Sequence, residues 1–307
     1  MRFAYLVITS FALSILGCKD SKAGYTNNGV TDAGQQSNGS TGGPFSADAK
    51  PLSGASQGAR ITAPSGNVYV QVGILGKGAA GEVFLARREK DNQSFAMKKT
   101  LAGAKAEFEI AATKAVTGRA GFTQLIEGFT VGSNAYIVLG RIGQSIESIR
   151  TRGGRILDLP RDTIGSIGLQ MVERLEVLHS LGFVHMDMYP NNVAVSQTNA
   201  NELVLFDFGE AKPYGGAGPS RMSDIQSLSH SVLQLLKPGT RYGDYKHYQD
   251  AGISLETLCE GLPVSVLNLF KYSHETLGRS DAPNYEYIRS ILMDLSPLYA
   301  GKLIWHF

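Results

Sequence analysis

The sequence predicts an α+β protein in which a small β-rich lobe with one main helix precedes a larger, mostly α-helical lobe. Short apolar runs separated by glycine-rich or polar turns indicate strands over 68–75, 82–87 and 94–98. Apolar residues at helical spacing indicate a long packed helix over 162–181. Because the strands come first and the helices follow, the two kinds of element are segregated, as in α+β folds.

Composition narrows the possible classes of protein. The chain has 307 residues, including 36 Gly and 2 Cys, with 43% hydrophobic residues and a formal net charge of +2. This is enough apolar content for a large core. The near-neutral charge gives no sign of nucleic-acid binding, and two cysteines exclude a disulfide-rich scaffold. We expect a monomer. The excess of glycine predicts a flexible segment, a glycine-rich functional loop, or both.

The N-terminus resembles an export signal. A 14-residue apolar run over 3–16 follows Arg2. It is shorter than the ~20 residues of a transmembrane helix and typical of a signal peptide. The run ends in Gly17-Cys18, which resembles the lipobox of bacterial lipoproteins, whose cysteine carries a lipid. The alternatives are an ordinary signal peptide with a chance cysteine, or a buried strand.

This interpretation divides the chain into three parts. We expect a signal peptide over 1–17, a flexible Gly/Ser-rich tether over 18–60 and a folded domain over 61–307, with its lobes at about 61–139 and 144–307. The protein would then be anchored to a membrane through a lipid on Cys18, or secreted. It is cytoplasmic if the N-terminus is not a signal.

A glycine-rich loop lies between the first two predicted strands. Gly76, Gly78 and Gly81 form a G-x-G-x-x-G pattern, which lets backbone N–H groups approach phosphate oxygens. A dinucleotide-binding fold would continue into a helix. Here a second strand follows, so the pattern favours a strand–loop–strand phosphate site in which Val83 covers an adenine.

The third strand and the next helix supply a charged pair. Alternation along 94–98 places Ala96 and Lys98 on one face, where a small residue can lie beside the base and the lysine can reach the phosphates. A helix over 104–117 places Glu109 on its packed face, where an acid needs a partner, and Lys98 would supply it. Glu107, on the same helix, is the alternative partner for Lys98.

A connection between the lobes follows. The strand 135–139 leads through a glycine-flanked segment, 140–143, to a short helix, which is typical of a hinge. In the long helix 162–181, Asp162 is the candidate N-cap.

Three polar residues mark the reaction centre. Two short strands near 193–196 and 203–206 predict a hairpin that brings Asn192 and Asp207 side by side. Such an oxygen pair beside a bound triphosphate suits Mg²⁺. Asp187 lies five residues before Asn192 and is therefore expected at the same end of the hairpin, where it would accept the proton of a substrate hydroxyl.

The ordered set of glycine loop, lysine, helix glutamate, H-x-D-x-x-x-x-N and D-F-G resembles the eukaryotic-type protein kinases, and most closely the casein kinase 1 group. The resemblance covers about 67–295, and its group-like passages are 142–147, 170–180, 223–228, 258–263 and 284–289. It implies a two-lobed kinase fold, ATP, Mg²⁺ and phosphoryl transfer to a hydroxyl of a protein or a small molecule. It also implies that His185 and Phe208 are spine residues and that Asp224 is a structural anchor beneath the catalytic loop. In a kinase the backbone of the hinge binds the adenine, so the resemblance makes Gly140 and Ile142 the expected adenine contacts.

Three departures from the family pattern leave the function open. Met186 replaces the H-R-D arginine, Tyr189 replaces the lysine of serine/threonine kinases, and only 14 residues separate Gly209 from Asp224. A serine/threonine protein kinase is the first hypothesis. The short segment favours a small-molecule phosphotransferase. All three departures, with an exported location where ATP is scarce, favour a membrane-tethered pseudokinase.

Overall fold

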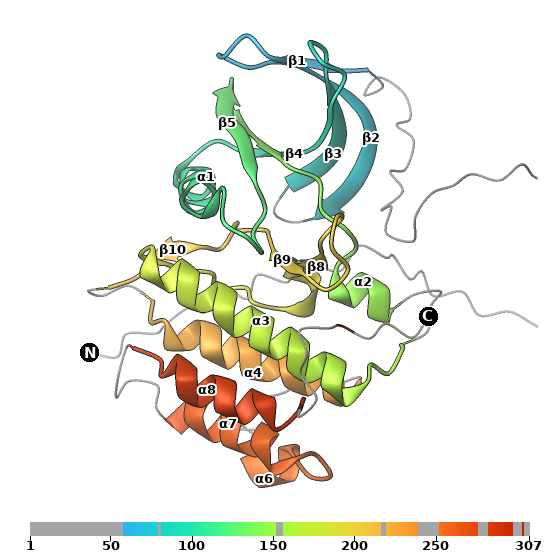
Figure 1. Ribbon diagram of the computed structural model, residues 1–307. Coiled ribbons are helices and arrows are strands. Elements are labelled where there is room, and N and C mark those ends of the chain that lie inside the picture. Colours follow the sequence, from blue (N-terminus) through green and yellow to red (C-terminus); the bar gives the residue numbers. More distant parts are fainter. Residues whose placement is uncertain are drawn as a thin grey trace, which may run out of the picture.

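The computed structural model describes residues 58–78, 81–151, 156–215, 219–238, 252–275, 282–296 and 303. The expected signal peptide, Cys18 and the tether as far as residue 57 lie outside the described residues, as do Ala79 and Ala80 at the tip of the glycine loop. Two lobes are stacked, with the β-rich lobe above the helical lobe in Figure 1.

The first lobe is a six-stranded antiparallel sheet with one helix. The strand order is β1-β2-β3-β4-β6-β5. The elements are β1 (Arg60–Thr62), β2 (Val68–Gly78), β3 (Gly81–Arg88), β4 (Ser94–Leu101), α1 (Ala104–Val116), β5 (Leu125–Val131) and β6 (Asn134–Leu139). The predicted strands and helix correspond to β2, β3, β4, β6 and α1. Strands β1 and β5 were not expected from the sequence, because each is short or mostly exposed and lacks an apolar run.

Antiparallel register places residues of neighbouring strands in rows across the sheet. Phe84, Met97 and Val138 form one such row, and all three side chains are buried. They point to the core side of the sheet, where Met97 and Val138 join a cluster with Tyr69, Phe95 and other residues. The next row, which is Val83, Lys98 and Ile137, therefore points to the opposite side of the sheet, toward the second lobe.

The second lobe is helical. Its helices are α2 (Ile146–Arg150), α3 (Arg161–Ser180), α4 (Met222–Leu236), α6 (Leu255–Leu258), α7 (Val264–Glu275) and α8 (Tyr285–Met293). Its short strands are β7 (Phe183–Val184), β8 (Val193–Val195), β9 (Leu203–Leu205) and β10 (Lys212–Pro213), and a 3-10 helix, η3, covers Pro190–Asn192. None of the helices in the described part of the chain has the length and apolar character of a membrane span.

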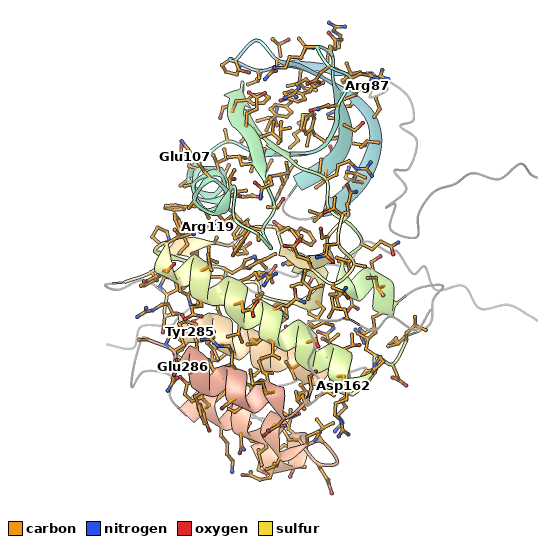
Figure 2. All side chains as sticks on the ribbon, in the orientation of Figure 1. Arg87, Glu107, Arg119, Asp162, Tyr285 and Glu286 are labelled. Carbon is orange, nitrogen blue, oxygen red and sulfur yellow. The ribbon has the colours of Figure 1, made fainter. Side chains whose placement is uncertain are left out.

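Helix α3 is central to the second core. The predicted stripe is buried throughout: Ile164, Ile167, Met171, Leu175 and Leu178. The prediction that Asp162 caps this helix was wrong, because Pro160 occupies the N-cap position and Asp162 lies in the first turn (Figure 2). A carboxylate in the first turn is still favourable, since it faces the positive end of the helix dipole.

Glycines let α3 and α8 pack closely. A Cβ atom at Gly165 would lie 2.6 Å from Ser296 Cβ and 2.9 Å from the Ser296 backbone N. A Cβ atom at Gly168 would lie 2.9 Å from Leu292 Cδ2. Since residues early in α3 meet residues at the end of α8, the two helices run antiparallel. The close packing that Gly165 and Gly168 allow thus compensates for the low helix propensity of glycine in α3.

Replacing Gly165 with Ala should destabilise the protein. Helix propensity alone would favour the substitution by ~1 kcal/mol, but overpacking against backbone atoms costs ~1–3 kcal/mol. We expect a smaller loss for Gly168→Ala, because the Leu292 methyl group that it meets is the end of a flexible side chain. Urea denaturation measures both, and a stabilised Gly165→Ala variant would contradict the packing argument.

Candidate active site

The sheet face that points toward the second lobe carries the predicted nucleotide residues. Lys98 lies opposite Val83 and Ile137, and Ala96 lies opposite Leu85 and Leu139. Side chains in rows two residues apart point to the same side of a sheet. Val83, Ala96 and Lys98 therefore share this face, which is opposite to the buried row that contains Met97.

Lys98 is held by two carboxylates from different parts of the chain. Its Nζ lies 2.7 Å from Glu109 Oε1 in α1 and 2.8 Å from Asp207 Oδ1, which follows β9. The Lys98 side chain is only 6% exposed. Burial alone would lower the pKa of Lys98, but the negative charges of Asp207 and Glu109 outweigh it and raise the pKa above its ordinary value. Lys98 is therefore charged.

Glu107, the fallback partner, lies on the exposed side of α1 (Figure 2). The choice between the two glutamates follows from helix periodicity, since Glu109 shares its face with the buried Ala112, Thr113 and Val116.

Gly209 gives this cluster its space. A Cβ atom there would lie 3.0 Å from Lys98 Nζ and 3.1 Å from Asp207 Oδ1. A side chain at 209 would therefore crowd the ion pair. The sequence contains this glycine as part of D-F-G, but its steric reason depends on contacts that the sequence does not reveal.

Asp187 is oriented by Asn192. Asn192 Nδ2 donates to Asp187 Oδ2 at 2.7 Å and to the Asp187 backbone O at 2.8 Å. Burial, helped by the charges of Asp207 and Glu210, raises the pKa of Asp187 above its ordinary value, although His185 and the Asn192 hydrogen bond oppose the shift. A carboxylate with a raised pKa is a better proton acceptor than an ordinary aspartate.

The hairpin of β8 and β9 places Asn192 opposite Phe206, the residue directly before Asp207. Val193 pairs with Leu205, and the Phe206 N–H donates to the Asn192 backbone O at 3.0 Å. Burial alone would raise the pKa of Asp207, but the charge and hydrogen bond of Lys98 lower it below the ordinary value. Asp207 is thus an anion at neutral pH.

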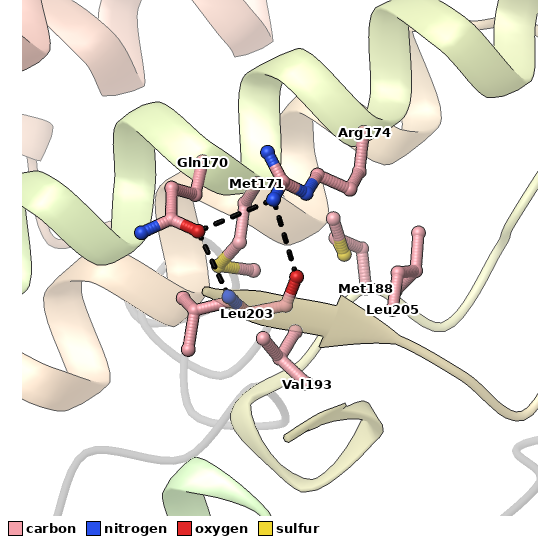
Figure 3. Close-up of a pocket in the computed structure, with 7 residues that line it drawn as sticks. All are labelled: Gln170, Met171, Arg174, Met188, Val193, Leu203 and Leu205. Carbon is pink, nitrogen blue, oxygen red and sulfur yellow. Dashed lines mark hydrogen bonds between the residues drawn. The ribbon is translucent and has the colours of Figure 1, made fainter. Parts of the chain in front are cut away.

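The hairpin is itself fastened to α3. Gln170 Oε1 accepts from the Leu203 N–H at 2.9 Å, and Arg174 Nη2 donates to the Leu203 O at 3.2 Å (Figure 3). The side chains around this contact, which include Met171 and Met188, leave essentially no room for a water molecule. Helix α3 therefore fixes the strand that leads to Asp207, and this pocket is packing space.

The donor set suits Mg²⁺. The Asn192 amide is oriented by its Nδ2 bonds, so its Oδ1 is the atom left for a ligand, with a 3.2 Å hydrogen bond from Asn191 Nδ2. Lys98 and the Gly209 N–H are the hydrogen-bond donors to Asp207 Oδ1. One amide oxygen and the remaining carboxylate oxygen would hold the ion, which usually takes its other ligands from water and phosphate.

Two hydrogen bonds hold the segment between the lobes. The Gly140 N–H donates to Gln124 O at 2.8 Å, and Ile142 O accepts from Gln197 Nε2 at 3.2 Å. That Gly140 and Ile142 contact an adenine stays a prediction. Gln124 and Gln197, which fix the segment from outside it, were not singled out in the sequence.

The glycine loop is a hairpin rather than the start of a helix. Gly76 pairs with Val83 and Gly78 with Gly81. Gly81 has φ 126°, and a Cβ atom there would lie 2.2 Å from Lys99 O, so only glycine fits. A cavity of about 500 Å³ opens beside this hairpin and the start of α1, with Gly81 and Glu109 among its lining residues.

Asp224 fastens the catalytic loop from below. Its Oδ2 accepts from the His185 N–H and its Oδ1 from the Met186 N–H, both at 2.7 Å. Met186 has φ 67°, a left-handed conformation that costs energy for a residue with a side chain. The rings of His185 and Phe208 are 5.1 Å apart. The contacts of Asp224 agree with the anchoring role that the resemblance implies, while the spine roles of His185 and Phe208 stay predictions.

The short segment after Gly209 runs directly to α4. Strand β10 pairs with β7, Glu210 forms an ion pair with Lys105 of α1, and α4 begins at Met222. Part of the segment, 216–218, lies outside the described residues.

Comparison with known proteins agrees with this geometry. The protein kinase domain family matches residues 69–230, and the chain belongs to that family. It is 26% identical over 265 residues to a probable casein kinase I homologue of Encephalitozoon cuniculi (strain GB-M1), covering 72% of this chain and 86% of the relative. It is 25% identical over 291 residues to casein kinase I homologue 3 of Schizosaccharomyces pombe (strain 972 / ATCC 24843), covering 78% of this chain and 65% of the relative.

Replacing Glu109 with Gln should lower the stability of the ligand-free protein by ~1–3 kcal/mol, less than the full loss of a buried pair because Asp207 still contacts Lys98. Glu107→Gln is the matched control, one exposed acid removed from the same helix, and should change stability by less than ~0.5 kcal/mol. Thermal unfolding without nucleotide compares them. Equal effects of the two substitutions would show that the Lys98 pair contributes nothing.

Proposed function

We propose that this protein is an ATP- and Mg²⁺-dependent phosphotransferase, most similar in function to casein kinase 1-type serine/threonine protein kinases. The observation that carries the proposal is the position of Lys98, bound at once to Glu109 and Asp207 at 2.7 and 2.8 Å. This arrangement supports an active conformation, because it joins the sheet, α1 and the segment after β9 around the expected phosphate site.

In the proposed reaction a substrate hydroxyl attacks the γ-phosphorus of ATP. The new O–P bond forms as the bond to the β-phosphate oxygen breaks, ADP leaves, and the hydroxyl proton passes to Asp187. Asn192 holds one oxygen of the Asp187 carboxylate, so the other is directed to the hydroxyl. Lys98 binds the phosphates, and the sheet face with Val83 and Ala96 covers the base. Bound Mg²⁺ supplies neutralisation of the phosphate charge.

One observation favours a different acceptor. The 14 residues between Gly209 and Asp224 leave little chain to form a platform for a peptide. Tyr189 also stands where serine/threonine kinases carry a lysine that steadies the γ-phosphate. A small hydroxyl-bearing molecule is therefore the second candidate acceptor.

Two substitutions test nucleotide binding and phosphoryl transfer separately. Mg²⁺–ATP at 100 times its dissociation constant should stabilise the wild type by ~2.7 kcal/mol, measured as a rise in melting temperature. Lys98→Met should abolish the rise. Asp187→Asn should keep it and lose about 10²–10⁴-fold in transfer rate, because only the proton acceptor is removed.

The acceptor is then identified by comparing transfer to casein or peptides with transfer to a panel of small alcohols. A wild type that shows no nucleotide-dependent stabilisation would overturn both enzyme hypotheses. Stabilisation without transfer to any acceptor would leave a nucleotide-binding pseudokinase.

The proposal extends to the location of the domain. Residues 1–17 direct export and Cys18 receives a lipid, so that 18–60 tether the kinase domain to a membrane. Mass spectrometry of the mature N-terminus should find a lipidated Cys18 in the membrane fraction. A chain that retains an unmodified Met1 in a membrane-free extract would overturn this part of the proposal.

A further inference from the structure

The catalytic loop is supported through a chain of hydrogen bonds that ends far from the site. His179, near the end of α3, lies between Asp224 of α4 and Tyr285 at the start of α8. His179 Nε2 is 2.8 Å from Asp224 Oδ2, and His179 Nδ1 is 2.6 Å from Tyr285 Oη. His179 is 1% exposed and Asp224 is fully buried, so water cannot replace these partners.

The chemistry of the three groups determines which atom donates and which accepts in each of the two His179 hydrogen bonds. The Asp224 carboxylate only accepts, so His179 Nε2 carries a proton and donates to it. In the neutral ring, Nδ1 is then an acceptor, and the Tyr285 hydroxyl donates to it. Burial raises the pKa of Tyr285 above its ordinary value, which keeps this hydroxyl protonated.

We infer that Tyr285 is a positioning residue for the catalytic loop, because its hydroxyl selects the His179 tautomer that holds Asp224 against the amides of His185 and Met186. The strained backbone of Met186 makes this support necessary. A left-handed φ at a residue with a side chain persists only where its surroundings over-determine it. Asp224 supplies that constraint only while its own carboxylate is held in one orientation.

The position of Tyr285 is fixed independently of this contact. It is the first residue of α8, whose N-cap Asn284 accepts from the Tyr287 N–H at 3.0 Å. Further along the helix pair, Arg289 Nη1 bonds to Glu176 Oε2 at 2.6 Å. The cap thus fixes the start of α8 itself, and the Arg289–Glu176 bond fastens the helix to α3 beyond the tyrosine. Helix α8 lies outside the 69–230 that the kinase family matches.

The test is Tyr285→Phe, with Tyr287→Phe as its matched control. Tyr287 lies in the same helix, is 43% exposed and packs on Tyr272, so its substitution removes the same hydroxyl without touching His179. We expect Tyr285→Phe to speed hydrogen exchange at the amides of 185 and 186 by about five- to tenfold, the loss due to one hydrogen bond. Tyr287→Phe should leave both rates unchanged.

A spectroscopic readout tests the tautomer directly. In the wild type, ¹⁵N shifts of the His179 ring should show a protonated Nε2 and an unprotonated Nδ1. A wild-type ring protonated at Nδ1 alone, or exchange rates that both variants change equally, would overturn the inference.

The kinetic readout rests on the proposed function. With an active enzyme, Tyr285→Phe should lower kcat about five- to tenfold and leave the KM for ATP unchanged, since Lys98 and the glycine loop are untouched. In a His179→Gln background the same substitution should have no further effect. If the wild type transfers no phosphate, the proposed function fails, while the exchange and ¹⁵N measurements still decide the role of Tyr285.

Discussion

The buried charge of Lys98 is the constraint on which the rest of the site depends. An ammonium group that is almost fully buried needs anionic partners, because desolvation without them would cost several kcal/mol. Its two partners come from α1 and from the segment after β9. The lysine therefore sets the position of a helix in the first lobe and of Asp207 in the second. The rows of the sheet, the hairpin and the glycine at 209 all serve to place these three side chains.

Asp224 plays a similar part beneath the catalytic loop, but through backbone groups. It accepts the amides of His185 and Met186, so the side chain at 186 takes no part in this contact. This explains how methionine can replace the family arginine without disturbing Asp187 or Asn192. The substitution removes a charged side chain, while the two backbone hydrogen bonds to Asp224 are kept.

The parts of the site that the sequence predicted are those with short-range signals. Strand alternation placed Ala96 and Lys98 on one face, helix periodicity separated Glu109 from Glu107, and a short hairpin placed Asn192 opposite the residue before Asp207. The parts that it missed lack such signals. Strand β5 is mostly exposed and has no apolar alternation. The helix that Asp162 was expected to cap begins after Pro160 instead. Tyr285 meets His179 across 106 residues of sequence, and only tertiary packing brings them together.

The short segment between Gly209 and Asp224 still contacts both lobes, but it does so through few residues. In place of a long loop, the chain after Gly209 forms the Glu210–Lys105 pair with α1 and then the short β10–β7 pairing. The first of these is a surface ion pair, with Lys105 58% exposed, and such pairs contribute little energy. The orientation of α1 must therefore come chiefly from the buried Lys98–Glu109 pair and from Ala112 and Val116, which join the core of the second lobe.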